Sequence, residues 1–220
     1  EITTRLVGSE MCIRDRLSHD TYKLARTVIY ATGSHHRHLG IKEEEQFIGK
    51  GVSYCAVCDG AFFKDKSVIV AGGGNSALGD ALYLSDICAD VYIVHRRDEF
   101  RGDAVTLEKL RSCDNVHIVT GVTIQALKGE KKLEEVVLSD GSVIKANGLF
   151  VAIGMEPETD ILKGVVKLDN TGYVVAGEDC VTSAKGLFVA GDVRTKELRQ
   201  VITAAADGAN AAAQVIKYLK

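Results

Sequence analysis

The feature that most constrains the fold is a short apolar run that opens directly into a glycine-rich turn. The run occupies residues 67–71 (SVIVA) and is followed by Gly72-Gly73-Gly74. A turn of the form G-x-G-x-x-A lets the backbone bend sharply, approach a pyrophosphate and keep strand and helix close together. The N-terminus of the next helix adds N–H donors and a positive dipole end. We therefore predict a dinucleotide-binding turn made by Gly72, Gly74, Asn75, Ser76 and Ala77.

The following residues continue an alternation of helix and strand. We expect a helix from Asn75 to about residue 87, a strand over 90–94, a helix over 103–112 and a strand over 116–120. This alternation is the βαβ pattern of a parallel sheet, so the fold class is α/β with a Rossmann-like domain. Apolar runs on either side of Ser139-Asp140-Gly141 predict an antiparallel hairpin that covers the sheet.

The C-terminal part of the chain predicts a further strand and helix. Residues 187–190 (LFVA) form a strand-like run before Gly191-Asp192, and a long helix begins at about Gln200. Most of this helix is Ala, Val, Ile and Leu, so we expect it to be mostly buried. Its polar residues fall on one stripe, namely Thr203, Asp207, Asn210, Gln214 and Lys217.

Basic residues end the second strand of the Rossmann-like unit, where His95, Arg96 and Arg97 occur in succession. An NAD-dependent protein usually places an acidic residue here, on the ribose hydroxyls. Cations, with Arg101 a turn later, would instead bind the 2′-phosphate of NADP through charge-assisted hydrogen bonds. A solvated basic patch, partly offset by neighbouring acidic residues, is the alternative. We expect NADPH as the donor rather than another electron donor.

Cys55 and Cys58 are the only closely spaced pair among six cysteines, and Asp59 follows them directly. This usage favours a reducing, cytoplasmic setting, where a C-x-x-C pair is more often catalytic or metal-binding than structural. A structural zinc site usually needs four ligands, and no second pair is evident. Two inert cysteines would leave the adjoining carboxylate unexplained. We therefore expect a redox dithiol without metal, in which Asp59 supplies or accepts a proton.

The composition limits the remaining classes of function. The chain has 220 residues, of which 46% are hydrophobic, and a formal net charge of −3. This length allows one large domain or two small ones. The mixed charge argues against a nucleic-acid or membrane surface, and no apolar run approaches the roughly 18 residues of a membrane span.

A further cofactor is implied by the combination of a nicotinamide with a dithiol. A nicotinamide transfers a hydride, which thiol–disulfide exchange does not accept directly. A flavin accepts the hydride and reduces an adjoining disulfide, so the two motifs together predict FAD.

Several spaced motifs also occur in the order that is typical of one enzyme family. They are CAVCDG, GGGNSA, HRRDEFR, GLFVAGDV and RQVITAA. Through them, from about Leu17 to the C-terminus, the chain resembles the low-molecular-weight, NADPH-dependent thioredoxin reductases. The resemblance implies a flavoprotein, usually a homodimer, whose NADPH domain is inserted within an FAD-binding domain and rotates between flavin reduction and exchange with thioredoxin.

The same resemblance implies roles for individual residues. Cys58 would be the sulfur nearer the flavin, Cys55 its disulfide partner and Asp59 the acid–base residue. Asp192, after Gly191, would accept a hydrogen bond from the FAD ribityl chain, although a turn or helix cap would equally explain this pair. The other FAD contacts that the resemblance implies are Thr32, Gly33, Arg199, Gln200 and Val201.

One part of the family pattern is absent from the sequence. The family begins with a second G-x-G-x-x-G, for FAD, and nothing before Arg26 matches it. We therefore expect an incomplete FAD-binding domain that lacks roughly a hundred residues. The expected division is a non-native or disordered leader over 1–16, a remnant of the FAD-binding domain over 17–36, the NADPH-binding domain over 37–148 and the C-terminal part of the FAD-binding domain over 149–220.

These interpretations lead to one expected function and leave alternatives open. Electrons would pass from NADPH through FAD to the Cys55–Cys58 disulfide and on to thioredoxin. A peroxiredoxin-reducing flavoprotein would share this module and carry a further C-x-x-C upstream. A catalytically silent NADP-binding fragment would bind NADPH without flavin.

Overall fold

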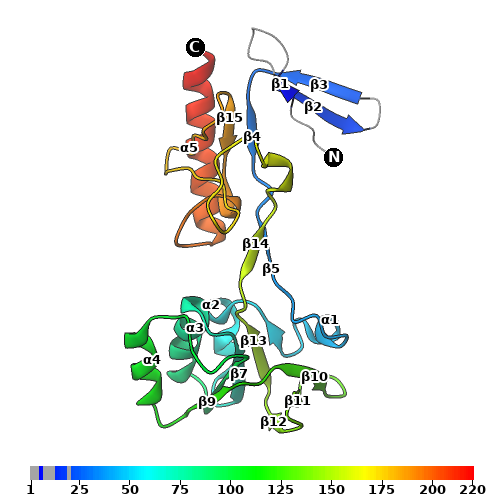
Figure 1. Ribbon diagram of the computed structural model, residues 1–220, viewed down its shortest axis with the longest axis vertical. Helices are drawn as coiled ribbons and strands as arrows, with labels where there is room; N and C mark the ends of the chain where they lie inside the picture. The colour runs from blue at the N-terminus through cyan, green and yellow to red at the C-terminus, as the bar shows by residue number, and fades with distance from the viewer. Residues whose placement is uncertain (1–4, 7–12, 19–20) are drawn as a thin grey trace. The chain divides into compact units, whose positions relative to one another are not determined.

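The structure, a computed structural model, describes residues 5–6, 13–18 and 21–220, which fall into two compact units (Figure 1). Unit 2 is one continuous stretch, His36–Gly154, whereas unit 1 combines the described residues up to His35 with Met155–Lys220. In chain order, unit 2 therefore interrupts unit 1. The expected leader over 1–16 lies partly outside the described residues.

A five-stranded parallel sheet forms the centre of unit 2, in the order β6-β13-β7-β8-β9. Its strands are β6 (Val52–Ser53), β7 (Ser67–Ala71), β8 (Asp90–His95), β9 (Val116–Thr120) and β13 (Gly148–Val151). The predicted βαβ alternation is confirmed, because α3 (Asn75–Ser85) connects β7 to β8 and α4 (Ala104–Arg111) connects β8 to β9.

Unit 2 extends further along the chain than the sequence predicts for the nucleotide-binding domain. The expected border follows residue 148, whereas unit 2 continues to Gly154. The cause is β13, which pairs in parallel with both β6 and β7 and is buried along its whole length. Its hydrogen bonds and apolar side chains therefore belong to the central sheet.

Both faces of the central sheet are covered. Along β7, Val68 and Val70 belong to a core that includes Leu78 and Leu84 of α3. The side chains of Ile69 and Ala71 point the other way, because successive residues of a strand alternate between the two faces of a sheet. They belong to a second core, under the antiparallel sheet of β10 (Ile124–Lys128), β11 (Glu135–Leu138) and β12 (Val143–Lys145). Burial on both faces explains why β7 is apolar from Val68 to Ala71.

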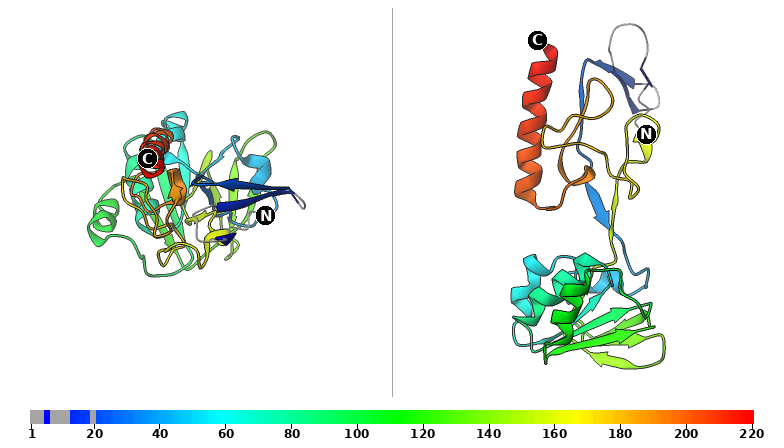
Figure 2. Two further views of the ribbon diagram at one scale, coloured as in Figure 1. Left: turned by 90° about the horizontal axis from the view of Figure 1, so that it is seen from above. Right: turned by 60° about the vertical axis from the view of Figure 1, so that its left-hand side comes forward.

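The predicted hairpin of β11 and β12 is confirmed, and β10 joins it as a strand that was not foreseen. Figure 2 shows this sheet and the helices α3 and α4 on opposite sides of the central sheet. The segment that leads into β6 contains a short helix, α1 (Glu44–Phe47), whose Phe47 joins the core under the hairpin.

Unit 1 contains a parallel pair of strands and one long helix. The strands are β4 (Val28–Tyr30) and β15 (Leu187–Val189), and the helix is α5 (Val201–Leu219). The strand and helix predicted near the C-terminus are thus confirmed.

The described residues of the two units contain several further short elements. The remaining strands are β1 (Arg5–Leu6), β2 (Ile13–Ser18), β3 (Thr21–Ala25), β5 (Ser34–His36) and β14 (Met155–Pro157). The remaining short helices are α2 (Ala56–Asp59), η1 (Gly60–Phe63), η2 (Asp160–Leu162) and η3 (Gly191–Val193).

The expectation that α5 is mostly buried is wrong. Only Asp207 and Ala211 of this helix are buried, whereas Val201 is 87% exposed and Ile202 71% exposed. The inward face carries Asp207 because buried cations of unit 1 bind its carboxylate. Ala211, Val215 and Tyr218 pack inward beside it, whereas the large apolar side chains of Val201, Ile202 and Ile216 are exposed. Within the described residues, no helix combines the length and the apolarity needed to cross a bilayer.

The burial of β13 leads to a stability prediction. Leu149 is fully buried and lies between Val52 and Ile69 of the neighbouring strands. Leu149→Ala should lower the free energy of unfolding by about 2–5 kcal/mol, because it removes buried methyl groups and leaves a cavity. Urea unfolding followed by circular dichroism measures this change. Val143→Ala, at a position that is 47% exposed, should change it by about 0.5 kcal/mol or less, and equal effects of the two variants would contradict this account.

Candidate functional site

The glycine-rich turn connects the carboxyl end of β7 to the first residue of α3. Gly72 has a φ of +151°, and a Cβ at this position would clash with the carbonyl oxygen of Ala152 and the Cβ of Ala77, so a side chain does not fit there. Around Gly74, by contrast, no atom lies within 4 Å of the place that a Cβ would take. The turn therefore packs tightly on one side and leaves its backbone open on the other.

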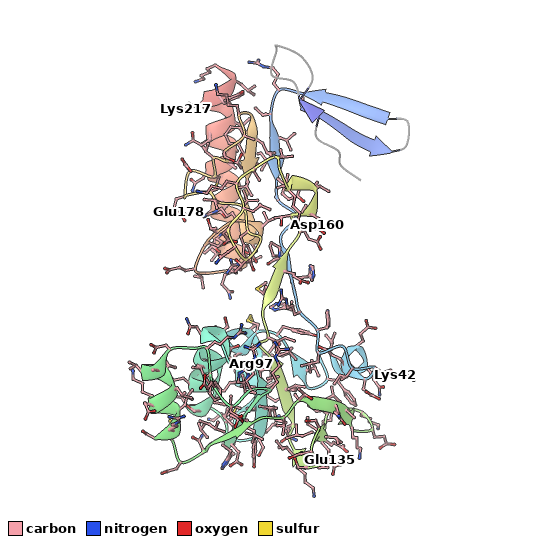
Figure 3. The ribbon with its side chains drawn as sticks, in the orientation of Figure 1. Lys42, Arg97, Glu135, Asp160, Glu178 and Lys217 are labelled. Carbon is pink, nitrogen blue, oxygen red and sulfur yellow. A yellow bond between two sulfur atoms is a disulfide. The ribbon has the colours of Figure 1, made fainter. Side chains whose placement is uncertain are left out.

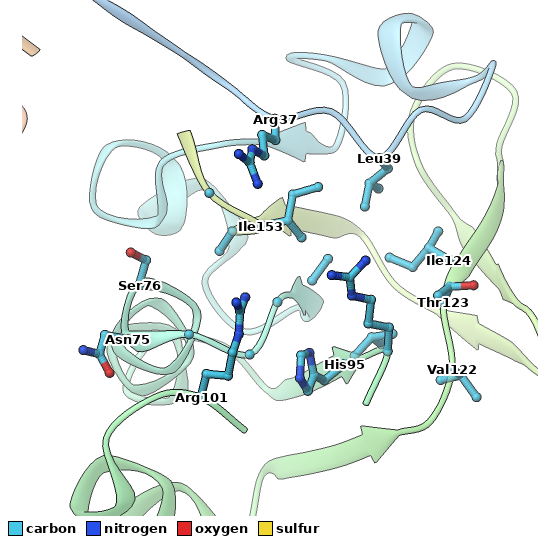
Figure 4. Close-up of a pocket in the computed structure, with 18 residues that line it drawn as sticks. Arg37, Leu39, Asn75, Ser76, His95, Arg101, Val122, Thr123, Ile124 and Ile153 are labelled. Atoms are coloured by element: carbon cyan, nitrogen blue, oxygen red, sulfur yellow. The ribbon is translucent and has the colours of Figure 1, made fainter. Parts of the chain in front are cut away.

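A cavity of about 420 Å³ lies at the carboxyl ends of β7, β8 and β13 (Figure 4). In this sheet the chain proceeds from β7 to β8 on one side, whereas β13 lies on the other side of β7. Ligands of open α/β sheets bind at such a switch point, outside the carboxyl ends of the strands. The predicted site residues that line the cavity are Gly72, Gly74, Asn75, Ser76, His95, Arg96 and Arg101.

The basic residues of the predicted site do not all reach the cavity. Arg96 and Arg101 line it, whereas Arg97, labelled in Figure 3, is not among its described lining residues. The backbone N–H of Arg101 donates a hydrogen bond to the Gly73 carbonyl at 2.8 Å. This bond holds the loop after β8 against the glycine-rich turn. The backbone of Arg101 is therefore fixed beside the cavity that its side chain lines.

His95 packs its imidazole ring against the glycine-rich turn. Its side chain is packed against Gly73, with the residue 5% exposed, and its ring lies 5.0 Å from the ring of Phe100. Burial lowers the pKa of His95, with a further contribution from the nearby arginines, while a backbone contact with Glu99 opposes the change. The lowered pKa favours the uncharged form of His95, whose ring packs under the turn. Ala77 is also buried beneath the turn and does not line the cavity.

The other walls of the cavity consist of residues that the sequence does not predict. Arg37 reaches it because its N–H donates to the Gly154 carbonyl at 3.0 Å, which joins two segments far apart in the chain. Figure 4 shows Arg37 across the cavity from Arg101. Apolar side chains on these walls include Leu39, Val122, Ile124 and Ile153. No local pattern identifies these residues, since each comes from a segment that only the tertiary fold brings here.

Cys55 and Cys58 form a disulfide, with their Cα atoms 5.3 Å apart. Cys55 caps the short helix α2, and its Sγ accepts a hydrogen bond from the Cys58 N–H at 3.2 Å. Cys58 is exposed and Cys55 half-buried. Val57, between them, is 65% exposed. The disulfide therefore lies at the surface of unit 2, where another molecule can reach it.

Asp59 lies at the end of α2 and is half-buried. Its Oδ2 accepts a hydrogen bond from the Ser53 hydroxyl at 2.7 Å, and its N–H donates to the Cys55 carbonyl at 3.1 Å. The structure thus brings the three residues predicted for redox chemistry together within one turn of helix.

Tyr54 anchors the segment that precedes the disulfide. Its hydroxyl donates to Oε1 of the buried Glu44 at 2.8 Å and lies 2.9 Å from Nδ1 of His38. Burial and the neighbouring Glu44 carboxylate raise the pKa of Tyr54. The second oxygen of Glu44 accepts from the Gly40 N–H at 3.1 Å. These bonds fix the 38–44 segment to the strand end that carries Cys55.

A second candidate site lies in unit 1, at the turn before α5. Asp192 Oδ1 and Arg199 Nε are buried and have no hydrogen-bond partner among the described residues. Buried polar atoms are nearly always hydrogen-bonded, so an acceptor and a donor without partners indicate a place for a polar ligand. The predicted residues Gln200 and Val201 begin α5, and the N–H of Gln200 is bound by Thr203 Oγ1 at 3.2 Å.

The N-terminal residues predicted for this second site lie at the end of β4. The Thr32 hydroxyl donates to the Glu158 carbonyl at 3.0 Å, and Gly33 has a φ of +77°. Arg199 lies with its guanidinium carbon 4.2 Å from the centre of the Tyr173 ring. These residues, with Gly191 and Asp192, all belong to unit 1.

A buried ionic cluster holds the turn that carries Asp192. Asp207 accepts from the Gly191 N–H at 2.9 Å, from Arg194 Nη2 at 2.6 Å and from Lys196 Nζ at 2.7 Å. Arg194 also donates to Glu178, labelled in Figure 3, at 2.9 Å. The carboxylate of Asp207 therefore ties α5 to the Gly191 end of the turn.

Comparison with known proteins places these sites in a family. The sequence profile of the pyridine nucleotide-disulphide oxidoreductases matches residues 7–208. The chain belongs to this family. Thioredoxin reductases of Mycoplasma genitalium and Mycoplasma pneumoniae are 43% identical over 205 residues and 45% identical over 198 residues. The matches cover 90% and 87% of this chain but 65% and 63% of the relatives, so the chain spans less than two thirds of their length.

Solved structures support the same assignment. The thioredoxin reductase of Streptococcus pyogenes superposes with a TM-score of 0.87 and 37% identity, over 99% of this chain and 72% of that one. The Giardia duodenalis thioredoxin reductase gives 0.88 and 34%, over 99% and 73%. The α/β fold class and the resemblance to thioredoxin reductases are confirmed.

The ionic cluster of this pyridine nucleotide-disulphide oxidoreductase leads to a pH prediction. Burial alone would raise the pKa of Asp207, but hydrogen bonds from Arg194, Lys196 and Gly191 lower it to about 2. An unfolded aspartate has a pKa of about 3.9, so this carboxylate stabilises the fold above that pH and loses its contribution as the pH falls through 2. The expected loss between pH 5 and pH 2 is about 2 kcal/mol of unfolding free energy.

Denaturant unfolding at several pH values measures this contribution. Asp207→Asn should remove most of it and should cost about 3–5 kcal/mol at pH 7, because two buried cations lose their partner. Asp160, 91% exposed, pairs with Lys163 at the surface, so Asp160→Asn serves as the control and should leave the pH dependence nearly unchanged. An unaltered pH dependence in the Asp207 variant would contradict the assignment.

Proposed function

We propose that the protein is an NADPH-dependent thioredoxin-disulfide reductase. The observation that carries this proposal is the coexistence, in unit 2, of an accessible disulfide beside Asp59 and a cavity lined by a glycine-rich turn and arginines. The names of the similar proteins support thioredoxin as the substrate. Since the chain spans 65% of the length of one such relative, the whole activity is stated as a proposal.

The cavity of unit 2 has the residues that NADPH needs. The open backbone at Gly74 and the N-terminus of α3 would hold the pyrophosphate. Arg96 and Arg101 would bind the 2′-phosphate, where planar guanidinium groups form paired hydrogen bonds. Arg37 adds positive charge on the opposite wall, and Ile153 adds apolar surface.

The polar atoms without partners in unit 1 fit a bound FAD. Asp192 Oδ1 would accept a hydrogen bond from the cofactor and Arg199 Nε would donate one. Bound FAD supplies the conversion of a hydride into two electrons for a disulfide. The other residues proposed to surround FAD are Thr32, Gly33, Gly191, Gln200 and Val201. Homodimer formation and a cytoplasmic setting remain predictions.

The reduced form of the Cys55–Cys58 pair performs the exchange with the substrate. Two electrons and two protons convert Cys55–Cys58 into two thiols. One thiol loses its proton and attacks the substrate disulfide, which forms a mixed disulfide and breaks the substrate S–S bond. The second cysteine then attacks the mixed disulfide, restores Cys55–Cys58 and releases the substrate as a dithiol. Asp59 is proposed to take up and return the protons, and Cys58 to be the sulfur nearer the flavin.

The NADPH assignment predicts a difference between Arg101, in the loop after β8, and Arg111, the last residue of α4. Arg101→Gln should weaken NADP⁺ binding by about 10-fold or more, because a hydrogen bond to a charged group is lost, and should leave NAD⁺ binding nearly unchanged. Isothermal titration calorimetry with both nucleotides measures this. Arg111, exposed on α4 and paired with Glu108, gives the matched control Arg111→Gln. An equal loss for NADP⁺ and NAD⁺ would rule out a 2′-phosphate contact.

The redox assignment predicts the effect of single cysteine variants. Cys58→Ser should abolish NADPH-dependent reduction of thioredoxin by the FAD-loaded protein, because a single thiol cannot re-form the internal disulfide. Oxidation of NADPH, followed by its absorbance in the presence of oxidised thioredoxin, measures this. Cys113 is a free, half-buried cysteine, so Cys113→Ser should keep the activity. Full activity of the Cys58 variant would refute the assigned role.

A further inference from the structure

Ser53 connects the backbone of the redox pair to Asp59. It is the last residue of β6 and is only 6% exposed. Its Oγ accepts a hydrogen bond from the Cys55 N–H at 3.1 Å and donates one to Asp59 Oδ2 at 2.7 Å. A hydroxyl has only one hydrogen to donate. The Asp59 carboxylate receives it, because it is closer to Ser53 Oγ than the Cys55 carbonyl, which lies at 3.5 Å, and is a stronger acceptor.

This arrangement restricts the carboxylate from two directions. The backbone of Asp59 is held by its N–H bond to the Cys55 carbonyl at 3.1 Å, within the turn of α2. The side chain is held by Ser53, whose own position is set by the parallel pairing of β6 with β13. The position of the Asp59 carboxylate is therefore fixed both by the sheet, through Ser53, and by the short helix that carries the cysteines.

We infer that Ser53 is a positioning residue, which holds the Asp59 carboxylate for proton transfer to and from the sulfur atoms. The inference rests on the proposed redox function of Cys55 and Cys58. A proton-transfer group must lie within hydrogen-bond reach of its target, so a carboxylate free to rotate would lose part of its effect. Ser53 itself exchanges no proton with substrate and acts through Asp59.

The chemical step can be followed without nucleotide or flavin. The dithiol form of the chain reacts with 2-hydroxyethyl disulfide, which it reduces to two molecules of 2-mercaptoethanol. One protein sulfur forms a mixed disulfide while the probe S–S bond breaks, and the second sulfur then displaces the remaining thiol. Two electrons pass from the protein to the probe, and the two thiol protons end on the released thiols.

A second serine–aspartate pair of the same sheet supplies a matched control. Ser67 Oγ, at the start of β7, donates to Asp90 Oδ2 at 3.0 Å. This pair resembles Ser53–Asp59 in chemistry but lies at the opposite end of the strands from the disulfide. Ser67→Ala therefore tests whether loss of any such hydrogen bond in unit 2 alters the exchange.

The experiment is a double-mutant cycle on the exchange rate, measured from pH 5 to pH 9 with the chemically reduced chain. Asp59→Asn should slow the exchange by about 100-fold and Ser53→Ala by about 10-fold, since positioned proton transfer typically contributes 10²–10⁴-fold. Ser53→Ala should also shift the pH profile. In the Asp59→Asn background, the same substitution should change the rate by about twofold or less, because Ser53 then has no carboxylate to position.

Each outcome decides the inference. Ser53→Thr retains the hydroxyl and should restore most of the rate, and Ser67→Ala should match the wild type. If Ser53→Ala slows the Asp59→Asn variant by as much as it slows the wild type, or has the wild-type rate and pH profile, the positioning role is overturned while the proposed function stands. If Asp59→Asn reacts at the wild-type rate, the acid–base role of Asp59 is overturned, and the inference with it.

Discussion

The parallel pairing of β6, β13, β7 and β8 is the constraint on which the rest of unit 2 depends. Parallel strands present their carboxyl ends at one edge of a sheet. The redox segment follows β6, Gly154 follows β13, the glycine-rich turn follows β7, and His95 ends β8. Groups separated by nearly a hundred residues thus emerge along the same edge. The proposed nucleotide cavity and the disulfide are consequences of one sheet topology.

The parts of this edge that the sequence predicts are those encoded by neighbouring residues. The strand, the glycine-rich turn and helix α3 follow one another directly, and the basic residues follow β8, so local spacing is sufficient. Arg37 and Ile153 join the cavity through tertiary contacts, such as the bond from Arg37 N–H to the Gly154 carbonyl. Backbone bonds of this kind leave no periodic signal. The same reason applies to β10, whose pairing with β11 was not foreseen.

Helix α5 shows how a polar residue can reverse an interpretation based on hydrophobicity. Its composition predicts burial, yet the buried side carries Asp207, and Val201 and Ile202 are exposed. A carboxylate is expensive to bury alone, but Arg194 and Lys196 are buried beside it and compensate its charge. The sequence shows the polar stripe, but it does not show the partners that bring Asp207 inward. The inward face of the helix is therefore set by this ion pairing together with the apolar contact of Ala211, Val215 and Tyr218.

Asp207 and Asp192 illustrate two different states of a carboxylate within unit 1. Asp207 is fully satisfied by Arg194, Lys196 and the Gly191 N–H, and it fixes the turn. Asp192, the next residue after Gly191, has a buried oxygen with no partner among the described residues. A fold that satisfies one carboxylate so completely does not lack donors in this region. The unpaired oxygen of Asp192 supports its proposed role as a binding group, and the cluster around Asp207 holds the turn that carries it.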